Sequence, residues 1–175
     1  RQQRQCLAET LPNLHDAYSV LVGKKLEDVL RNINGYVASY MAFDGEISLS
    51  TLNKNLIKQK RLLLPAINSE ENKLNFYEVK SFSQIQKTPL GFDQPMQKDE
   101  PIWPVVVLVP LVAYGPGGSR LGFGKGFYDK ELEDVPRRKM FSAIFDFQLV
   151  DKEFREEHDI KVDKVFTEKR VITIN

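Results

Sequence analysis

One stretch, Val105 to Glu133, restricts the fold of this chain more than any other. It opens with the apolar run VVVLVPLVA, crosses the glycine- and proline-rich segment GPGGSRLGFGKG, and ends in FYDKELE, where a helix can begin. The apolar run is too short for a membrane helix and predicts a buried strand. Glycines let backbone N–H groups approach an anion, and a helix N-terminus adds unpaired donors and the favourable end of its dipole. The stretch therefore predicts a phosphate site, with Arg120 and Lys125 as its cations.

Strands and helices alternate along the rest of the chain. Strands are expected at Tyr36–Phe43, Lys60–Ile67, Leu74–Lys80, Val105–Ala113, Met140–Phe147, Val162–Phe166 and Arg170–Ile174. An amphipathic helix from about Asn13 to the stop at Asn34 and Gly35 carries its apolar stripe on Val22, Leu26, Val29, Leu30 and Ile33. A second helix, capped by Ser48, Ser50 or Thr51, carries Leu52, Leu56 and Ile57.

Three further segments have weaker patterns. Arg1 to Gln5 is polar and predicts the tail of a helix, whose surface is either a solvated face or a ligand contact. Asp44 to Glu46 forms a turn after the first strand, and residues 81–104 indicate a long surface loop. The alternation favours one α/β domain over residues 1–175, a three-layer sandwich with a mixed, largely parallel sheet, Rossmann-like in class.

Composition excludes several classes of partner. Lys and Arg total 25 against 24 acidic residues, so the net charge of +1 provides no basic field for a nucleic acid. The single cysteine, Cys6, excludes an intramolecular disulfide or a cysteine zinc cluster and is typical of a reducing compartment. We therefore expect a cytoplasmic protein, monomeric, with no membrane span and no nucleic-acid partner.

Several familiar loop chemistries do not match the glycine-rich segment. A Walker loop needs Ser or Thr after its lysine, but Gly126 follows Lys125. The glycine spacing also misses the dinucleotide fingerprint, which disfavours a nicotinamide-dependent dehydrogenase. Leu121 stands where a serine nucleophile elbow needs its second glycine. His15 and His158 are the only histidines, so a hydrolytic triad is disfavoured as well.

Anion binding by backbone N–H groups remains. Arg120 and Lys125 would supply counter-charges, and Asp129, one helical step further on, could hold Mg²⁺. This combination suits a nucleoside triphosphate, whose transfer chemistry depends on positioning and charge neutralisation. The alternative is a glycine-rich turn that serves only tight strand-to-helix packing and leaves Lys125 in solvent.

The segment Arg120–Asp129, RLGFGKGFYD, resembles the signature of the 5-formyltetrahydrofolate cyclo-ligases, also called methenyltetrahydrofolate synthetases. Further pieces occur in the family's order along nearly the whole chain. They are Gly45–Ile47, Leu64–Pro65, Gly91–Pro95, Phe147–Val150 and His158–Asp159. The resemblance implies an ATP- and Mg²⁺-dependent conversion of 5-formyltetrahydrofolate to 5,10-methenyltetrahydrofolate, with the γ-phosphoryl group transferred to the formyl oxygen.

The resemblance also implies roles for individual residues. ATP would be bound by Arg120, Leu121, Gly122, Phe123, Gly124, Lys125, Gly126, Phe127 and Tyr128. The catalytic residues would be Lys125, Tyr128 and Arg120. The reduced folate would contact Tyr40, Met41, Glu46, Phe123 and Phe127, and Mg²⁺ would be held by Asp129 and Asp159.

Three positions depart from the family pattern. Members commonly carry Phe-Asp where this chain has Tyr114-Gly115, an arginine at the place of Ala66, and a second tyrosine at the place of Phe127. These differences remove polar groups from the implied site. They leave an alternative open, a non-catalytic member of the same fold that retains the loop to bind a nucleotide or another anion.

Overall fold

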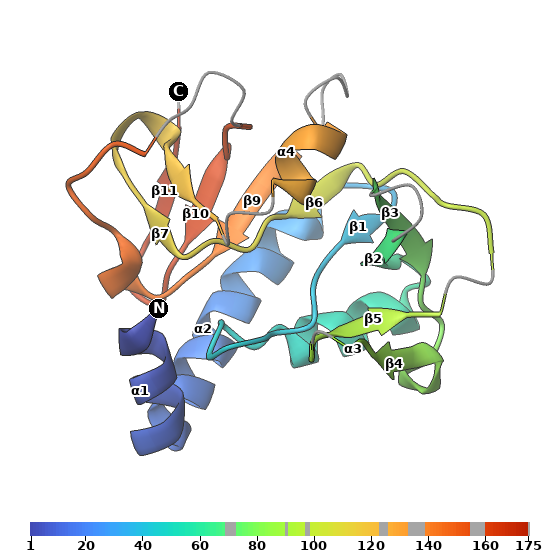
Figure 1. The fold of residues 1–175 in the computed structure, drawn as a ribbon, viewed down its shortest axis with the longest axis horizontal. Helices are drawn as coiled ribbons and strands as arrows, with labels where there is room; N and C mark the ends of the chain where they lie inside the picture. The colour runs from blue at the N-terminus through green and yellow to red at the C-terminus, as the bar shows by residue number, and fades with distance from the viewer. Residues whose placement is uncertain are drawn as a thin grey trace.

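The computed structural model describes residues 1–68, 73–89, 91–96, 99–122, 126–132, 139–154 and 160–174, and it is built around one seven-stranded sheet (Figure 1). The strands of that sheet are β1 (Val37–Ala38), β2 (Leu62–Asn68), β3 (Lys73–Glu78), β6 (Val106–Leu108), β9 (Lys139–Ala143), β10 (Lys164–Phe166) and β11 (Val171–Thr173). Their order is β11-β10-β9-β6-β1-β2-β3. The five inner strands are parallel, while β3 and β11 pair antiparallel at the two edges. The expected mixed, largely parallel α/β sheet is confirmed.

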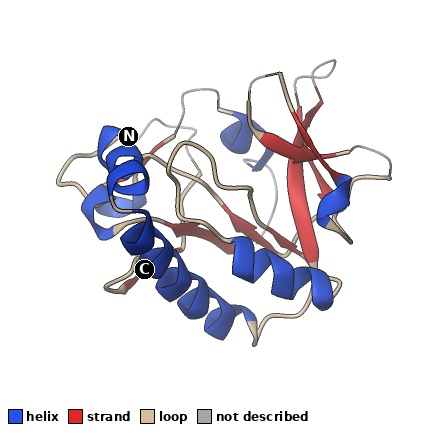
Figure 2. Ribbon diagram, turned by 90° about the horizontal axis from the view of Figure 1, so that it is seen from below, coloured by secondary structure: helices blue, strands red, loops and turns tan. Residues whose placement is uncertain are grey.

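Helices α1 (Gln2–Thr10), α2 (Pro12–Leu30) and α3 (Ser50–Lys58) lie on one side of the sheet. Figure 2 shows the long helices as a layer along one side of the strands. The predicted stripe of α2 is confirmed at Val22, Leu26 and Leu30, which are buried in the same cluster as residues of β1, β2 and β6. This cluster is the main core, and it joins the helical layer to the sheet. The helix ends at Leu30, however, before the expected stop at Asn34 and Gly35.

The opposite face of the sheet is covered by shorter pieces. Helix α4 (Phe127–Leu132) packs here through Leu132, in a cluster with Ala38, Leu63 and Val107, the strand residues that point away from α2. Two small sheets flank the main one, formed by β4 (Ile85–Lys87) with β5 (Asp93–Pro95) and by β7 (Ala113–Tyr114) with β8 (Arg120–Leu121). Short 3₁₀ turns occur at η1 (Phe82–Gln84), η2 (Pro116–Gly118) and η3 (Asp146–Gln148).

Several predicted boundaries were wrong for local reasons. The strand expected at Tyr36–Phe43 shrinks to β1, because the chain then leaves the sheet and the Tyr40 carbonyl accepts a bond from the Asn53 side chain at 3.0 Å. The strand expected at Val105–Ala113 ends before Pro110, whose ring nitrogen cannot donate to a ladder. The loop expected at 81–104 contains η1, β4 and β5.

Helix starts also differ from expectation. Helix α3 begins after Leu49, and none of the serine and threonine candidates forms a side-chain cap, so the predicted cap is wrong. The predicted order of strand, loop and helix is interrupted by the β7–β8 hairpin, which places Arg120 on a strand instead of in the loop. Helix α4 begins at Phe127, as the sequence predicted.

Burial on α2 makes a testable prediction about stability. We expect Val22→Ala to lower the free energy of unfolding by about 2 kcal/mol, because Val22 is fully buried in the main core. Val20→Ala on the same helix is the matched control, since Val20 is 45% exposed and the helix propensities change identically. Urea unfolding of both variants measures the difference. Equal effects would contradict the placement of this core.

Candidate active site

The candidate site lies where the topology of the sheet reverses. From β1 the chain moves outward to β2 and β3, and later strands are added on the other side, beginning with β6. The carboxyl ends of β1 and β6 therefore diverge at a switch point, where ligands of open α/β sheets commonly bind. The segments that leave these two strands carry Tyr40, Glu46 and the approach to Arg120.

Glu46 is a buried carboxylate in the segment that follows β1, with 7% of the residue exposed. Its Oε2 accepts the Phe43 N–H at 3.0 Å, and its Oε1 lies 3.8 Å from Arg4 Nη1. His15 Nε2 lies 3.0 Å from the backbone oxygen of Glu46 and donates to it. Burial raises the pKa of Glu46 to about 7, while the Phe43 N–H bond and the charge of Arg4 oppose that rise. The carboxylate is therefore poised between its two protonation states near neutral pH.

The negative charge of Glu46 acts on two tyrosine hydroxyls, those of Tyr40 and Tyr128. Burial, followed by the negative charge of Glu46, raises the pKa of Tyr40, whose hydroxyl donates to the Ile47 carbonyl at 3.3 Å. Burial and then Glu46 also raise the pKa of Tyr128 on α4, with Arg120 acting in the opposite sense. Both hydroxyls therefore stay neutral at physiological pH and can donate hydrogen bonds. Electrostatic interactions therefore link Tyr40 and Glu46, in the segment after β1, with Tyr128 of α4 and Arg120 of β8.

Arg120 and Asp129 form an ion pair that ties three segments together. Arg120 Nη2 donates to Asp129 Oδ1, and the side chains are 5% and 22% exposed. The same carboxylate oxygen accepts the Ile160 N–H at 3.2 Å, and Arg120 Nε donates to the Ile160 carbonyl at 3.4 Å. The strand β8, the first turn of α4 and the chain before β10 are held together by these bonds.

The remaining predicted residues fall into two groups. Phe123, Gly124, Lys125 and Asp159 lie outside the described residues. Of the others, Leu121 is 42% exposed, Gly126 adopts a positive φ of 62° at the start of α4, and Phe127 packs against the cluster around Leu132. Met41 packs against the main core and its sulfur lies 4.0 Å from Asn53 Nδ2. Gly122, Phe127 and Met41 are all partly buried.

One charged residue in this region had no role in the sequence analysis. Arg4 is 1% exposed and approaches Glu46, although Arg1 to Gln5 suggested only a solvated face or a ligand contact. The signal that could have found it is the spacing of Arg1 and Arg4, which places two cations on one helix face.

The departure at Gly115 has a steric reason in this fold. A Cβ at this position would lie 2.0 Å from the Lys152 carbonyl oxygen and 2.8 Å from Ser119 Oγ. The Val150 N–H donates to the Tyr114 carbonyl at 2.9 Å, which holds the segment around Lys152 against β7. An aspartate could stand here only if that segment lay elsewhere.

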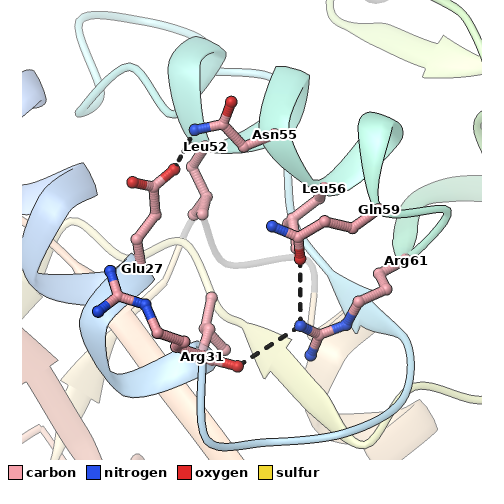
Figure 3. A pocket seen from close by; sticks show the side chains of 8 residues that line it. Glu27, Arg31, Leu52, Asn55, Leu56, Gln59 and Arg61 are labelled. Atoms are coloured by element: carbon pink, nitrogen blue, oxygen red, sulfur yellow. Dashed lines mark hydrogen bonds between the residues drawn. The ribbon is translucent and has the colours of Figure 1, made fainter.

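A pocket of about 310 Å³ lies between α2 and α3, and its lining residues are not among those of the candidate site (Figure 3). It is lined by Glu27, Leu30, Arg31, Leu52, Asn55, Leu56, Gln59 and Arg61. Glu27 is bonded to Asn55, and Arg61 donates to the carbonyls of Leu30, at 3.5 Å, and Gly35, at 2.8 Å. Arg61 precedes β2, so the pocket opens at the amino end of that strand, and its polar groups serve to join α2 to α3.

Within the described ranges, no group of three or more His, Cys, Asp and Glu side chains could hold a metal ion. The predicted pair of Asp129 and Asp159 has one member outside those ranges. None of the described helices is both long and apolar enough to cross a membrane.

Fold and site together define an α/β protein with a buried carboxylate, Glu46, in the segment that leaves β1 at a sheet switch point. A family model described as the 5-formyltetrahydrofolate cyclo-ligase family matches residues 7–168, and the chain belongs to that family. The resemblance noted in the sequence is thereby confirmed.

Individual relatives agree with this assignment. The chain is 32% identical over 143 residues to the 5-formyltetrahydrofolate cyclo-ligase of Escherichia coli K12, covering 77% of this chain and 79% of the relative. The NMR structure of Aquifex aeolicus 5,10-methenyltetrahydrofolate synthetase is similar with a TM-score of 0.84 and 30% identity, covering 99% and 88% of the two chains. A Mycoplasma pneumoniae 5,10-methenyltetrahydrofolate synthetase, 21% identical with a TM-score of 0.72 over 95% and 93% of the chains, shares the fold.

The raised pKa of Glu46 makes a prediction about stability and pH. Because folding raises this pKa from the ordinary value of 4.5 to about 7, keeping Glu46 ionised destabilises the native state as the pH rises through that window. We expect the stability advantage of Glu46→Gln over the natural protein to grow by about 3 kcal/mol between pH 4.5 and 7 and then level off.

Urea unfolding across pH 4 to 8 measures this difference. Glu9→Gln is the control, since Glu9 is exposed on α1 and its replacement should leave a flat difference. A flat difference for Glu46→Gln would contradict the burial of an ionisable carboxyl group at this position.

Proposed function

We propose that this protein closes 5-formyltetrahydrofolate to 5,10-methenyltetrahydrofolate, consuming ATP and releasing ADP and phosphate. Membership of the cyclo-ligase family supports the reaction. The structural observation that supports the reaction most is the buried carboxylate of Glu46. Its charge raises the pKa of the Tyr128 hydroxyl at the start of α4. In this proposal the site for the folate ring adjoins the site for the triphosphate.

The chemistry requires activation of a poor leaving group. The formyl oxygen attacks the γ-phosphorus, an O–P bond forms, and the bond from that phosphorus to ADP breaks. The formyl carbon becomes imidate-like, so N10 of the folate can attack it, and N10 loses its proton. The C–O bond then breaks and phosphate leaves with the former formyl oxygen. The protein's task is to align the two substrates and to offset the charge on the transferring group.

The nucleotide side of the site is formed by residues 120–128. Backbone N–H groups of the glycine-rich loop and the charges of Arg120 and Lys125 bind the triphosphate in this proposal. Lys125 lies outside the described residues, whereas Arg120 is buried and paired with Asp129. Binding of the triphosphate therefore has to compete with Asp129 for the guanidinium of Arg120.

Asp129 and Asp159 would hold Mg²⁺, which offsets the charge of the phosphate oxygens when it is bound. The described residues fit this role in one respect. The Asp129 carboxylate, a hard oxygen ligand, is 22% exposed and accepts the N–H of Ile160, the chain neighbour of Asp159. The two predicted ligands therefore belong to segments that are joined by a hydrogen bond.

The folate side of the site is formed by Glu46 with Tyr40, Met41, Phe123 and Phe127. A buried carboxylate is the acceptor that suits the donor-rich edge of a pterin ring, and Tyr40 and Met41 supply an apolar wall beside it. Burial and the charge of Glu46 keep Tyr128 neutral, so in this proposal its hydroxyl donates to the formyl oxygen or to the transferring phosphoryl group.

The proposal extends to the setting in which the protein works. Both substrates are small molecules, and the net charge of +1 supplies no attraction for a nucleic acid. We propose one domain over residues 1–175, monomeric and cytoplasmic.

The reaction is tested with the protein, 5-formyltetrahydrofolate, Mg²⁺ and ATP, by following the absorbance of the methenyl product. We expect product to form only when ATP is present, with one phosphate released for each ring closed. ATP binding without product would instead support the non-catalytic alternative, for which Gly115 is the structural departure.

Tyr128→Phe tests the role of the hydroxyl. We expect turnover to fall by a factor on the order of 100, because one donor to developing charge is lost, with little change in the melting temperature. Tyr36→Phe is the matched control, since Tyr36 packs against the same cluster as Tyr128. Equal turnover in the two variants would remove Tyr128 from the mechanism.

A further inference from the structure

Hydrogen bonds connect the start of α1 to Asp44, in the turn that carries Glu46. Asp44 receives bonds from three side chains of this region: Arg1 Nε at 2.5 Å and Arg4 Nη2 at 3.2 Å reach Oδ2, and Gln5 Nε2 reaches Oδ1. Arg4 Nε also donates to the Asp44 backbone oxygen at 2.9 Å. A Cβ at Gly45 would lie 2.7 Å from the Arg4 carbonyl oxygen, so the turn rests directly on the helix backbone.

The guanidinium of Arg4 bridges the switch point. Its Nη1 lies 3.3 Å from the Leu111 carbonyl oxygen, in the segment that leaves β6, and 3.8 Å from Glu46 Oε1, in the segment that leaves β1. The side chain is 1% exposed, so water does not screen its charge. One buried cation thus touches both segments whose divergence forms the site.

The titratable and charged groups that face Glu46 come from three helices and from the segment that leaves β1. They are Arg4 of α1, His15 of α2, Asp44 of the preceding turn, Tyr40 after β1 and Tyr128 of α4. The described contact of His15 is with the backbone oxygen of Glu46. The negative charge of Asp44 disfavours ionisation of Glu46, and the charge of Glu46 in turn raises the pKa of Tyr40 and Tyr128. Arg4 is the member of this group that favours the ionised carboxylate.

We propose that Arg4 is a positioning residue for the reaction: from the first helix it orients Glu46 and favours the ionised carboxylate that accepts hydrogen bonds from the folate ring. The inference rests on the proposed function, and it adds the residue on which the folate contact depends. Asp44 holds the guanidinium of Arg4 in place, because it accepts hydrogen bonds from Nε and Nη2. The third nitrogen, Nη1, then lies near Glu46 and the Leu111 carbonyl oxygen.

Steady-state kinetics of Arg4→Gln tests this role. We expect the KM for 5-formyltetrahydrofolate at pH 7 to rise at least about tenfold, while the KM for ATP changes less than about twofold. The acid limb of the pH profile of kcat/KM for the folate should move up by about one pH unit, because Glu46 loses the charge that favours its ionised form. Arg4→Lys keeps the charge and should recover most of the pH profile.

Gln3→Ala is the control on the same helix, since Gln3 is exposed and should leave both KM values unchanged. In the Glu46→Gln background, Arg4→Gln should raise the dissociation constant for the folate by less than about twofold, because no ionisable carboxylate remains for Arg4 to act on. A rise in the KM for ATP instead, an unmoved pH profile, or an equal loss in both backgrounds would overturn the proposal.

Unfolding experiments separate failure of this inference from failure of the proposed function. In Arg4→Lys and Arg4→Gln proteins, the midpoint of the Glu46-dependent change in stability can be measured without any substrate. A midpoint that rises in Arg4→Gln but not in Arg4→Lys supports the coupling even if no methenyl product forms. An unchanged midpoint contradicts the coupling even if the natural protein is fully active.

Discussion

The parallel pairing of β1 with β2 on one side and with β6 on the other is the constraint on which this structure depends. Because the chain continues from these neighbouring strands in opposite directions, their carboxyl ends leave a space that neither connection fills. The segments lining that space must cover the end of the main core and still expose groups for chemistry. Tyr40 illustrates both tasks, since its ring is buried in the core and its hydroxyl bonds to Ile47.

Several charged side chains at this site are buried. Arg4, Glu46 and Arg120 each have less than a tenth of their surface exposed, and each is held by partners from a different part of the chain. Removing one member of such a group typically destabilises a protein by about 3–5 kcal/mol, because the other charge is left uncompensated. The groups at this site therefore stabilise one another, and substrates have to exchange with bonds that already exist, as with Arg120 and Asp129.

The sheet class and the α2 stripe could be predicted because they rest on local periodicity, which three turns of helix or one strand are enough to show. The boundaries after β1 and β6 could not, since they are set by side-chain bonds such as Asn53 to Tyr40 and by tertiary packing. The burial of Arg4 depends on Asp44, a partner 40 residues away, and the spacing of Arg1 and Arg4 indicates a shared helix face but not the residue that the face meets. The site residues named from the family resemblance stay predictions, and for Lys125 and Asp159 they lie outside the described ranges.

The central claim is that the formyl oxygen of the folate becomes an oxygen of the released phosphate, on a site formed around Glu46 and Tyr128. The most direct measurement uses 5-formyltetrahydrofolate labelled with ¹⁸O in the formyl group and follows the product phosphate by ³¹P NMR. Phosphoryl transfer to the formyl oxygen predicts one ¹⁸O atom in each phosphate molecule, seen as an isotope shift of its resonance. Unlabelled phosphate released together with methenyl product would contradict the account.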